Sequence, residues 1–318
     1  MPTLAADPWS PERGMGFEAA LNEAQASADP HVETTDWTAP IVPDAVVEPG
    51  SLWFVDGVRR IELRLLATEG ARRAFGLFGT AAVGAVHCDG RASFAHDEVH
   101  RALVLGAGMS ADPVSLSIGG ARLVFRPAAE PGADANAPLD GLQKLMQAAE
   151  ANLAARLAAE GDALVLADGR LGFLDATASP VVGVVKRLVR AYLEPAHDAL
   201  LPRLAPGERT PLFGLAYEGS GLERYAWYTR LTARRAPFHG HAGILRCEVR
   251  AGLGVPEAVA IADRVSALLP GFAGRPSDPR APQNLVPVGG LEAWLQHRMG
   301  HRGLIRRALT TWLIGQEG

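Results

Sequence analysis

The sequence contains very few cysteines and lysines. Its only cysteines are Cys88 and Cys247, too few for a disulfide framework or a cysteine-rich zinc site. Any bound metal would therefore have oxygen or histidine ligands. Its only lysines are Lys144 and Lys186, so nearly all of its positive charge is arginine. Because alanine, glycine, leucine and proline are also abundant, this excess indicates GC-rich codon usage rather than a selected arginine surface.

Long apolar runs and several well-known motifs are also missing. No apolar segment reaches the roughly 18 residues of a membrane span, and residues 1–30 lack a basic start followed by an apolar core. We therefore expect a cytoplasmic protein that makes no membrane contact. The chain has no phosphate-binding Walker loop, no Gly-x-Ser-x-Gly elbow and no dinucleotide-binding fingerprint. Any ATP-driven motor that acts with it would be a separate protein.

The overall composition is that of an ordinary globular protein. Of the 318 residues, 48% are hydrophobic and 21% are charged, which suits one elaborated domain or two small ones. The formal net charge of −4 argues against uniform coating by nucleic acid. It leaves room for a local basic track.

The first half of the chain is predicted to be rich in strands. Residues 1–50 are read as an irregular N-terminal arm with one short helix near Pro11–Ala26. Asp56-Gly57-Val58 is predicted to join the first two strands as a tight antiparallel hairpin. The predicted strands are Leu52–Asp56, Arg59–Ala67, Ala74–His87, Val99–Leu105, Val114–Ile118 and Ala121–Phe125.

The second half alternates between helices and strands. An apolar stripe predicts a helix over 139–160, and a strand from Ala163 to Asp168 follows it directly. Further strands are expected at Tyr225–Thr232 and Gly243–Val249, a helix from Gly254 to Leu269, and two helices between Gly289 and Ile314. A meander that leads into helix–strand units is typical of the ribonuclease H-like α/β fold. We therefore predict a mixed sheet flanked by helices over 51–318, with a small β insert at about 88–137 and extra C-terminal helices.

Three acidic residues are the candidates for metal binding and catalysis. Asp56 and Asp168 each end an apolar strand and precede a glycine, and an unpaired carboxylate at such a position is costly. Glu150 lies at the edge of the helix's apolar stripe. Each has a plain structural alternative, since aspartates before glycine cap turns and rim glutamates reach solvent. If the three converge, they suit Mg²⁺ or Mn²⁺, and two such ions about 3.5–4 Å apart cleave phosphodiesters.

Four islands of the sequence carry a resemblance to a known family. On these residues the chain, from Leu52 to Ala308, resembles the NurA nucleases, whose members have a ribonuclease H-like domain and act on DNA ends. The islands are Phe54-Val55-Asp56-Gly57-Val58-Arg59-Arg60-Ile61-Glu62, Glu150 ahead of Ala167-Asp168-Gly169, Val182-Gly183-Val184-Val185-Lys186, and Pro282-Gln283-Asn284-Leu285-Val286-Pro287-Val288-Gly289-Gly290.

The resemblance implies an activity, a metal and partners. Asp56, Glu150 and Asp168 would hold Mn²⁺ or Mg²⁺, as two ions, for hydrolysis of DNA at double-strand breaks. A homodimer would dock on a hexameric HerA-type ATPase during end resection and repair.

The chain departs from the family pattern near its C-terminal end. Complete relatives have a tyrosine followed by a metal-binding histidine, whereas this region offers Asp278, Asn284 or Glu292, with His297 one turn later. A catalytically weakened DNA-binding or assembly subunit therefore stays an alternative. An actin-like ATPase or sugar kinase is less favoured, because the bulky residues after Gly57 would obstruct a phosphate.

Several further residues have two readings each. Glu62 is either an outer metal ligand or a partner of Arg60 or Arg64, and Lys186 either contacts the scissile phosphate or ends a secondary-structure element. Trp227 and Tyr228 either stack on bases or belong to the core, with the core favoured. His239 and His241 are not expected to bind metal. The arginines that either line a DNA groove or form a solvated fringe are Arg59, Arg60, Arg187 and Arg190.

Overall fold

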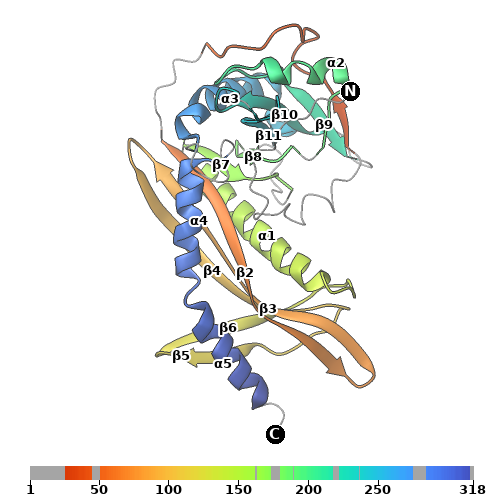
Figure 1. Ribbon diagram of the computed structural model, residues 1–318, viewed down its shortest axis with the longest axis vertical. Coiled ribbons are helices and arrows are strands. Elements are labelled where there is room, and N and C mark those ends of the chain that lie inside the picture. The colour runs from red at the N-terminus through yellow and green to blue at the C-terminus, as the bar shows by residue number, and fades with distance from the viewer. Residues whose placement is uncertain are drawn as a thin grey trace. The chain divides into compact units, whose positions relative to one another are not determined.

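The computed structural model is a mixed α/β protein with a large mixed sheet flanked by helices (Figure 1). It describes residues 26–44, 51–161, 163–172, 180–188, 190–217, 222–235, 237–274 and 284–315. The chain divides into two compact units: unit 1 holds Met1–Phe54, His87–Ala92 and Ala154–Gly289, and unit 2 holds Val55–Val86, Ser93–Leu153 and Gly290–Gly318. None of the helices within the described ranges is long and apolar enough to cross a membrane.

Unit 1 is built on a sheet in which most neighbours are antiparallel. The exception is the parallel pair β7/β8, in which Asp168 lies opposite Val184. Short helical segments connect the strands: α2 (Pro195–Asp198), η3 (Leu201–Arg203), η4 (Ala251–Leu253) and η5 (Leu269–Phe272), together with the longer α3 (Val255–Leu268). The hydrogen-bonded order is β1 (Ala26–Asp29), β9 (Phe213–Tyr217), β10 (Leu222–Arg230), β11 (Ile244–Arg250), β8 (Val182–Val185) and β7 (Leu164–Asp168).

Both faces of the unit 1 sheet are buried. Side chains alternate along β10, so Ala226 and Tyr228 pack into a cluster that includes Trp37 and Phe213 on one face. Trp227 points to the other face and donates a hydrogen bond from its indole Nε1 to Ser266 of α3, at 3.1 Å. Trp227 and Tyr228 are therefore core residues, as favoured from the sequence, and do not form a base-stacking surface.

Unit 2 contains the longest strands. β2 (Leu52–Glu69) starts in unit 1, where the backbone N–H of Leu164 donates to the carbonyl of Ser51 at 3.3 Å and places β7 beside it. β4 and β6 are parallel, and β5 and β6 are antiparallel. The order continues from β2 through β3 (Arg72–Cys88), β4 (Ala92–Leu105), β6 (Ala121–Ala129) and β5 (Val114–Ile118).

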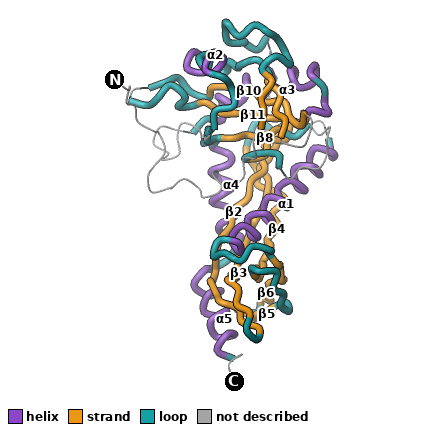
Figure 2. Tube along the Cα trace, turned by 90° about the vertical axis from the view of Figure 1, so that its right-hand side faces the viewer, coloured by secondary structure: helices purple, strands orange, loops and turns teal. Residues whose placement is uncertain are grey.

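Two helices cover opposite faces of β3 in unit 2 (Figures 1 and 2). A Cβ added at Gly79 would meet Leu142 of α1 (Ala137–Glu160), and one added at Gly84 would meet Leu295 of α4 (Val286–Arg298). Positions 79 and 84 differ by an odd number, so their side chains point to opposite faces of the strand. We call these faces the α1 face and the α4 face.

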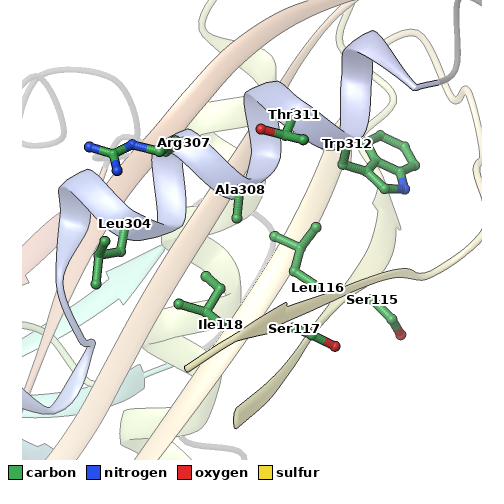
Figure 3. Close-up of a pocket in the computed structure, with 9 residues that line it drawn as sticks. All are labelled: Ser115, Leu116, Ser117, Ile118, Leu304, Arg307, Ala308, Thr311 and Trp312. Carbon is green, nitrogen blue, oxygen red and sulfur yellow. The ribbon is translucent and has the colours of Figure 1, made fainter. Parts of the chain in front are cut away.

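The last helix, α5 (Arg302–Ile314), extends the cover on the α4 face. Its buried residues Ile305 and Leu309 pack with Phe78 of β3 and Phe125 of β6. Figure 3 shows α5 above β5, where the two elements line a groove of about 420 Å³. The groove has apolar walls, formed largely by Leu116, Ile118, Ala308 and Trp312.

Most predicted elements are confirmed, including the helix now bounded as Ala137–Glu160 and the two C-terminal helices. The predicted hairpin at Asp56-Gly57-Val58 is wrong, because β2 runs unbroken through these residues to Glu69. The chain turns instead beyond Glu69, where Gly70 has a φ of +59°. The N-terminal arm, which was expected to be irregular, supplies β1. Its predicted helix near Pro11–Ala26 lies outside the described residues, except for Ala26, the first residue of β1.

Candidate metal centre

Asp56 lies inside β2 and is only 6% exposed. Its Oδ1 accepts a hydrogen bond from the backbone N–H of Gly57 at 2.8 Å. Asp56 and Arg60 are an even number of positions apart, so their side chains point to the same face of the strand. Arg60 donates to the carbonyls of Met299 and Gly300, at the end of α4. The Asp56 carboxylate therefore points to the α4 face of the sheet.

A second carboxylate meets Asp56 on that face. Glu292 of α4 brings an oxygen within 4.8 Å of a carboxylate oxygen of Asp56. Its neighbours Leu291 and Leu295 are fully buried, and both contact a Cβ placed at Gly84, which fixes this side of the helix against β3. From the sequence, Glu292 was one of three candidates near the C-terminal end to replace the family's metal-binding histidine. The structure places its carboxylate close to that of Asp56.

Two carboxylates this close in a largely buried place repel each other unless a cation or a proton lies between them. Oxygen ligands of this kind suit Mg²⁺, Mn²⁺ or Ca²⁺ better than the softer metals. The Asp56–Glu292 pair therefore offers oxygen atoms of the kind that bind divalent cations, and both side chains are held on regular secondary structure.

Glu150 lies on the opposite face from this pair. Its Oε1 would be 2.4 Å from a Cβ placed at Gly57, and Gly57 follows Asp56 directly on the strand. Successive residues of a strand point to opposite faces, so the Glu150 carboxylate lies on the α1 face. The structure thus does not gather Glu150 with Asp56 and Glu292. The helical periodicity placed Glu150 correctly at the sheet but carried no information about which face α1 would cover.

The contact between Gly57 and Glu150 predicts a stability effect. In Gly57→Ala, the new methyl group would also lie 2.9 Å from Cγ of Met146, so the helix or its side chains must shift. We expect a loss of about 1–3 kcal/mol in the free energy of unfolding, measured by urea denaturation. The matched control is Gly161→Ala, where no atom lies within 4 Å of the added methyl. Its expected change is within about 0.5 kcal/mol, and equal losses in the two variants would contradict the packing described.

Asp168 and Lys186 form a pair in unit 1. The Lys186 Nζ lies 2.6 Å from Asp168 Oδ2, and the two side chains are 11% and 20% exposed. The pair forms because β7 and β8 are parallel neighbours and both residues lie at the ends of these strands. Lys186, predicted to act on phosphate, thus lies beside a predicted metal ligand, whose negative charge it stabilises.

Glu62 is engaged in a buried network further along β2. Its side chain is fully buried and accepts hydrogen bonds from Arg60 Nη2 at 2.8 Å and Thr80 Oγ1 at 2.7 Å. This is the alternative in which Glu62 pairs with Arg60, although the pair is buried rather than exposed. Arg60 is likewise held by Glu62 and by carbonyls at the end of α4.

Two of the predicted DNA-binding arginines, Arg59 and Arg60, lie on opposite faces of β2. Arg59 points to the α1 face and donates from Nε to the Gln143 side chain at 2.5 Å, whereas Arg60 points to the α4 face. Burial lowers the pKa of Arg59, an effect that nearby Asp140 partly offsets. In unit 1, Arg187 is half-buried, and Arg190 lies 5.4 Å from the ring centre of Tyr192. A continuous groove lined by all four arginines stays a prediction.

The remaining candidates lie elsewhere or outside the described residues. Asn284 is buried in unit 1, and its carbonyl accepts from the N–H of Gly274 at 2.5 Å. Asp278 falls in the range 275–283, which the structure does not describe. His241 lies 3.6 Å from Asp198, and burial lowers the pKa of its imidazole. Within the described ranges His241 and His239 belong to no group of three close metal ligands.

Sequence reasoning missed two aromatic pairs. Trp53 stacks on His87 in unit 1, with ring centres 4.4 Å apart, and His87 Nε2 lies 2.5 Å from Ser51 Oγ. In unit 2, Phe94 stacks on Trp294. The partners are 34 and 200 positions apart, so no local pattern in the sequence indicates either pair.

The comparisons with known proteins add no assignment. No family model matches the chain, and no curated protein matches it significantly.

Proposed function

We propose that this protein is a divalent-metal-dependent DNA nuclease with a ribonuclease H-like core, similar to the NurA family. The observation that carries the proposal is the buried Asp56 on a central strand with the Glu292 carboxylate within 4.8 Å. Two carboxylates held this close on regular secondary structure offer oxygen ligands to one cation. A hard divalent cation on carboxylates is the equipment that phosphodiester hydrolysis needs.

Asp168 is the proposed third ligand. Its place in the sequence supports it: Asp168 ends the strand β7 and precedes Gly169, as Asp56 precedes Gly57. Its Oδ2 also lies 2.6 Å from the Lys186 Nζ, which stabilises the ionised carboxylate.

The chain's own residues would share the work as follows. Asp56, Glu292 and Asp168 would hold the cation, which supplies charge neutralisation and a more acidic bound water. Lys186, held 2.6 Å from Asp168, would offer a positive charge to a phosphate oxygen as negative charge develops there. Glu150, named from the sequence as one of the three metal ligands, lies on the α1 face next to Gly57 and has no part in this arrangement. The phosphodiester would be cleaved by in-line attack of water with departure of the 3′ oxygen.

The biological setting belongs to the same proposal and comes from the resemblance. It comprises a cytoplasmic homodimer that resects DNA ends for double-strand break repair with a HerA-type ATPase. The uninterrupted β2 argues against the actin-like alternative, since Gly57 forms no turn that cradles a phosphate.

A nuclease assay tests the proposal. End-labelled linear DNA, single- and double-stranded, would be incubated with the protein in Mn²⁺, in Mg²⁺ and in chelator. We expect cleavage that depends on the metal, is strongest in Mn²⁺ and stops in chelator. Cleavage that persists in chelator would contradict the proposal. If no cleavage occurs but Mn²⁺ raises the melting temperature, the weakened DNA-binding or assembly subunit is the better description.

A further inference from the structure

An aromatic stack joins β4 and α4 within unit 2. The rings of Phe94 and Trp294 are nearly parallel, with an interplanar angle of 14° and centres 5.3 Å apart. A carbon of the Phe94 ring would also lie 3.4 Å from a Cβ placed at Gly290, one turn before Trp294. Glycine at 290 therefore leaves room for the Phe94 ring to lie against the helix.

The two rings differ in how they are held. Trp294 is half-buried, and its Cζ3 would lie 3.4 Å from a Cβ at Gly84 of β3. Phe94 is 44% exposed, so much of its ring is open to solvent. The stack thus has a fixed inner ring and an open outer ring. A planar molecule could extend it at little cost in side-chain entropy, because Phe94 is already placed.

A positive charge lies beside the stack. The Arg298 guanidinium is 5.8 Å from the Trp294 ring centre, within the range of cation–π contact. Arg298 is exposed, and its Nε donates to the Asp97 carboxylate of β4, so it bridges the same two elements as the rings. Between Phe94 and Asp97, His96 has a φ of +56°, a left-handed conformation uncommon for a residue with a side chain. The start of β4 is therefore held in an unusual local geometry.

The stack lies on the same face as the Asp56–Glu292 pair. Trp294 and Glu292 are both on α4, and Asp56 points to the α4 face of β2. β2, β3 and β4 are consecutive in the sheet, so the start of β4 is two strand spacings, about 10 Å, from β2. A polynucleotide with a phosphate at the carboxylate pair would reach the stack within a few nucleotides.

From these positions we propose that the Phe94–Trp294 stack binds an unpaired base of a single-stranded DNA segment close to the cleaved phosphate. The inference rests on the proposed nuclease function and names its substrate class, a single strand or a frayed end. An aromatic face accepts any base, because every base has a π-face, and the Arg298–Asp97 ion pair beside the rings ties α4 to β4 around the stack. Duplex ends would engage the stack only after their terminal pair opens.

Binding of a fluorescein-labelled oligo-dT, followed by anisotropy in chelator so that no cleavage occurs, tests the stack directly. Phe94→Ala is expected to weaken binding about tenfold, and Phe94→Trp to retain it. The matched control is Phe75→Ala on β3, since Phe75 is 46% exposed and therefore similar in accessibility. This control is expected to bind like the wild type, and blunt duplex binding should change little in any variant.

The possible outcomes separate the two proposals. If the wild type cleaves DNA in Mn²⁺ while Phe94→Ala and Phe75→Ala bind oligo-dT alike, the stack does not bind bases and the nuclease proposal stands. If the wild type neither binds nor cleaves DNA, both fail. If Phe94→Ala leaves oligo-dT binding intact but changes the mass measured by light scattering, the stack is a contact between copies of this chain, which also overturns the inference.

Discussion

Asp56→Asn is expected to abolish metal-dependent DNA cleavage while the fold is retained. Asparagine has the same shape and still accepts the hydrogen bond from the Gly57 N–H, but it carries no negative charge for a cation. The expected loss is at least about a thousandfold in the single-turnover rate, equivalent to roughly 4 kcal/mol of transition-state stabilisation. Asp168→Asn should behave in the same way. Full activity in either purified variant would overturn the assignment.

The accompanying stability measurement makes this test sharper. Asparagine keeps the shape of the side chain and its hydrogen bond from Gly57, so Asp56→Asn should still unfold in one cooperative transition without metal. The rise in melting temperature caused by Mn²⁺ should disappear, because the variant no longer binds the cation. Glu160→Gln, an exposed change at the end of α1 with the same change in charge, is the matched control. It should keep both the activity and the response to Mn²⁺.

Glu62→Ala is expected to cost about 3–5 kcal/mol in the free energy of unfolding. The Glu62 side chain is fully buried, and its removal leaves the Arg60 guanidinium, only 13% exposed, without its carboxylate. The Thr80 hydroxyl loses its acceptor at the same time. Urea denaturation, with the slope checked for constancy, gives the difference directly.

An exposed ion pair between the end of β2 and the start of β3 provides the control for Glu62. Glu69 lies 3.2 Å from Arg72, but the two side chains are 70% and 59% exposed. Glu69→Ala should therefore cost no more than about 1 kcal/mol. If Glu62→Ala is as mild as this control, the buried network is not structural. Loss of Mn²⁺-dependent cleavage with little loss of stability would instead favour the reading of Glu62 as an outer metal ligand.

The secondary structure was largely readable from the sequence, and β2 shows where this reading failed. The acidic residue and glycine at positions 56 and 57 resemble a turn in the sequence, but β2 continues across them to Glu69. Gly57 is there because Glu150 and Met146 approach the strand, and not because the chain reverses. Only tertiary packing distinguishes these two uses of glycine, and the sequence carries no local sign of it.

The candidate site was predictable in its acids but not in their grouping. Asp56 was chosen because charge at a buried strand position is costly, and the structure confirms its burial. Glu292 was one of several options, because it lies more than 200 residues after Asp56 in the chain. No local pattern in the sequence indicates that two such distant residues are close in the fold. Glu150 had the stronger sequence case and yet lies on the α1 face. The spacing of apolar residues indicates which side of a helix packs against the sheet. It does not indicate which of the two faces of the sheet the helix covers, because that depends on how the chain connects the helix to the strands.

The chain path of unit 2 has a consequence for biosynthesis. Residues of α5 such as Ile305 and Leu309 close a core whose other walls come from β3 and β6, while 154–289 belong to unit 1. During translation, Phe78 and Phe125 therefore stay exposed until the whole intervening segment and α5 have been synthesised. The exposed apolar surface makes the nascent polypeptide prone to aggregation. Chaperones that cover this surface during synthesis should accordingly improve the soluble yield of this protein.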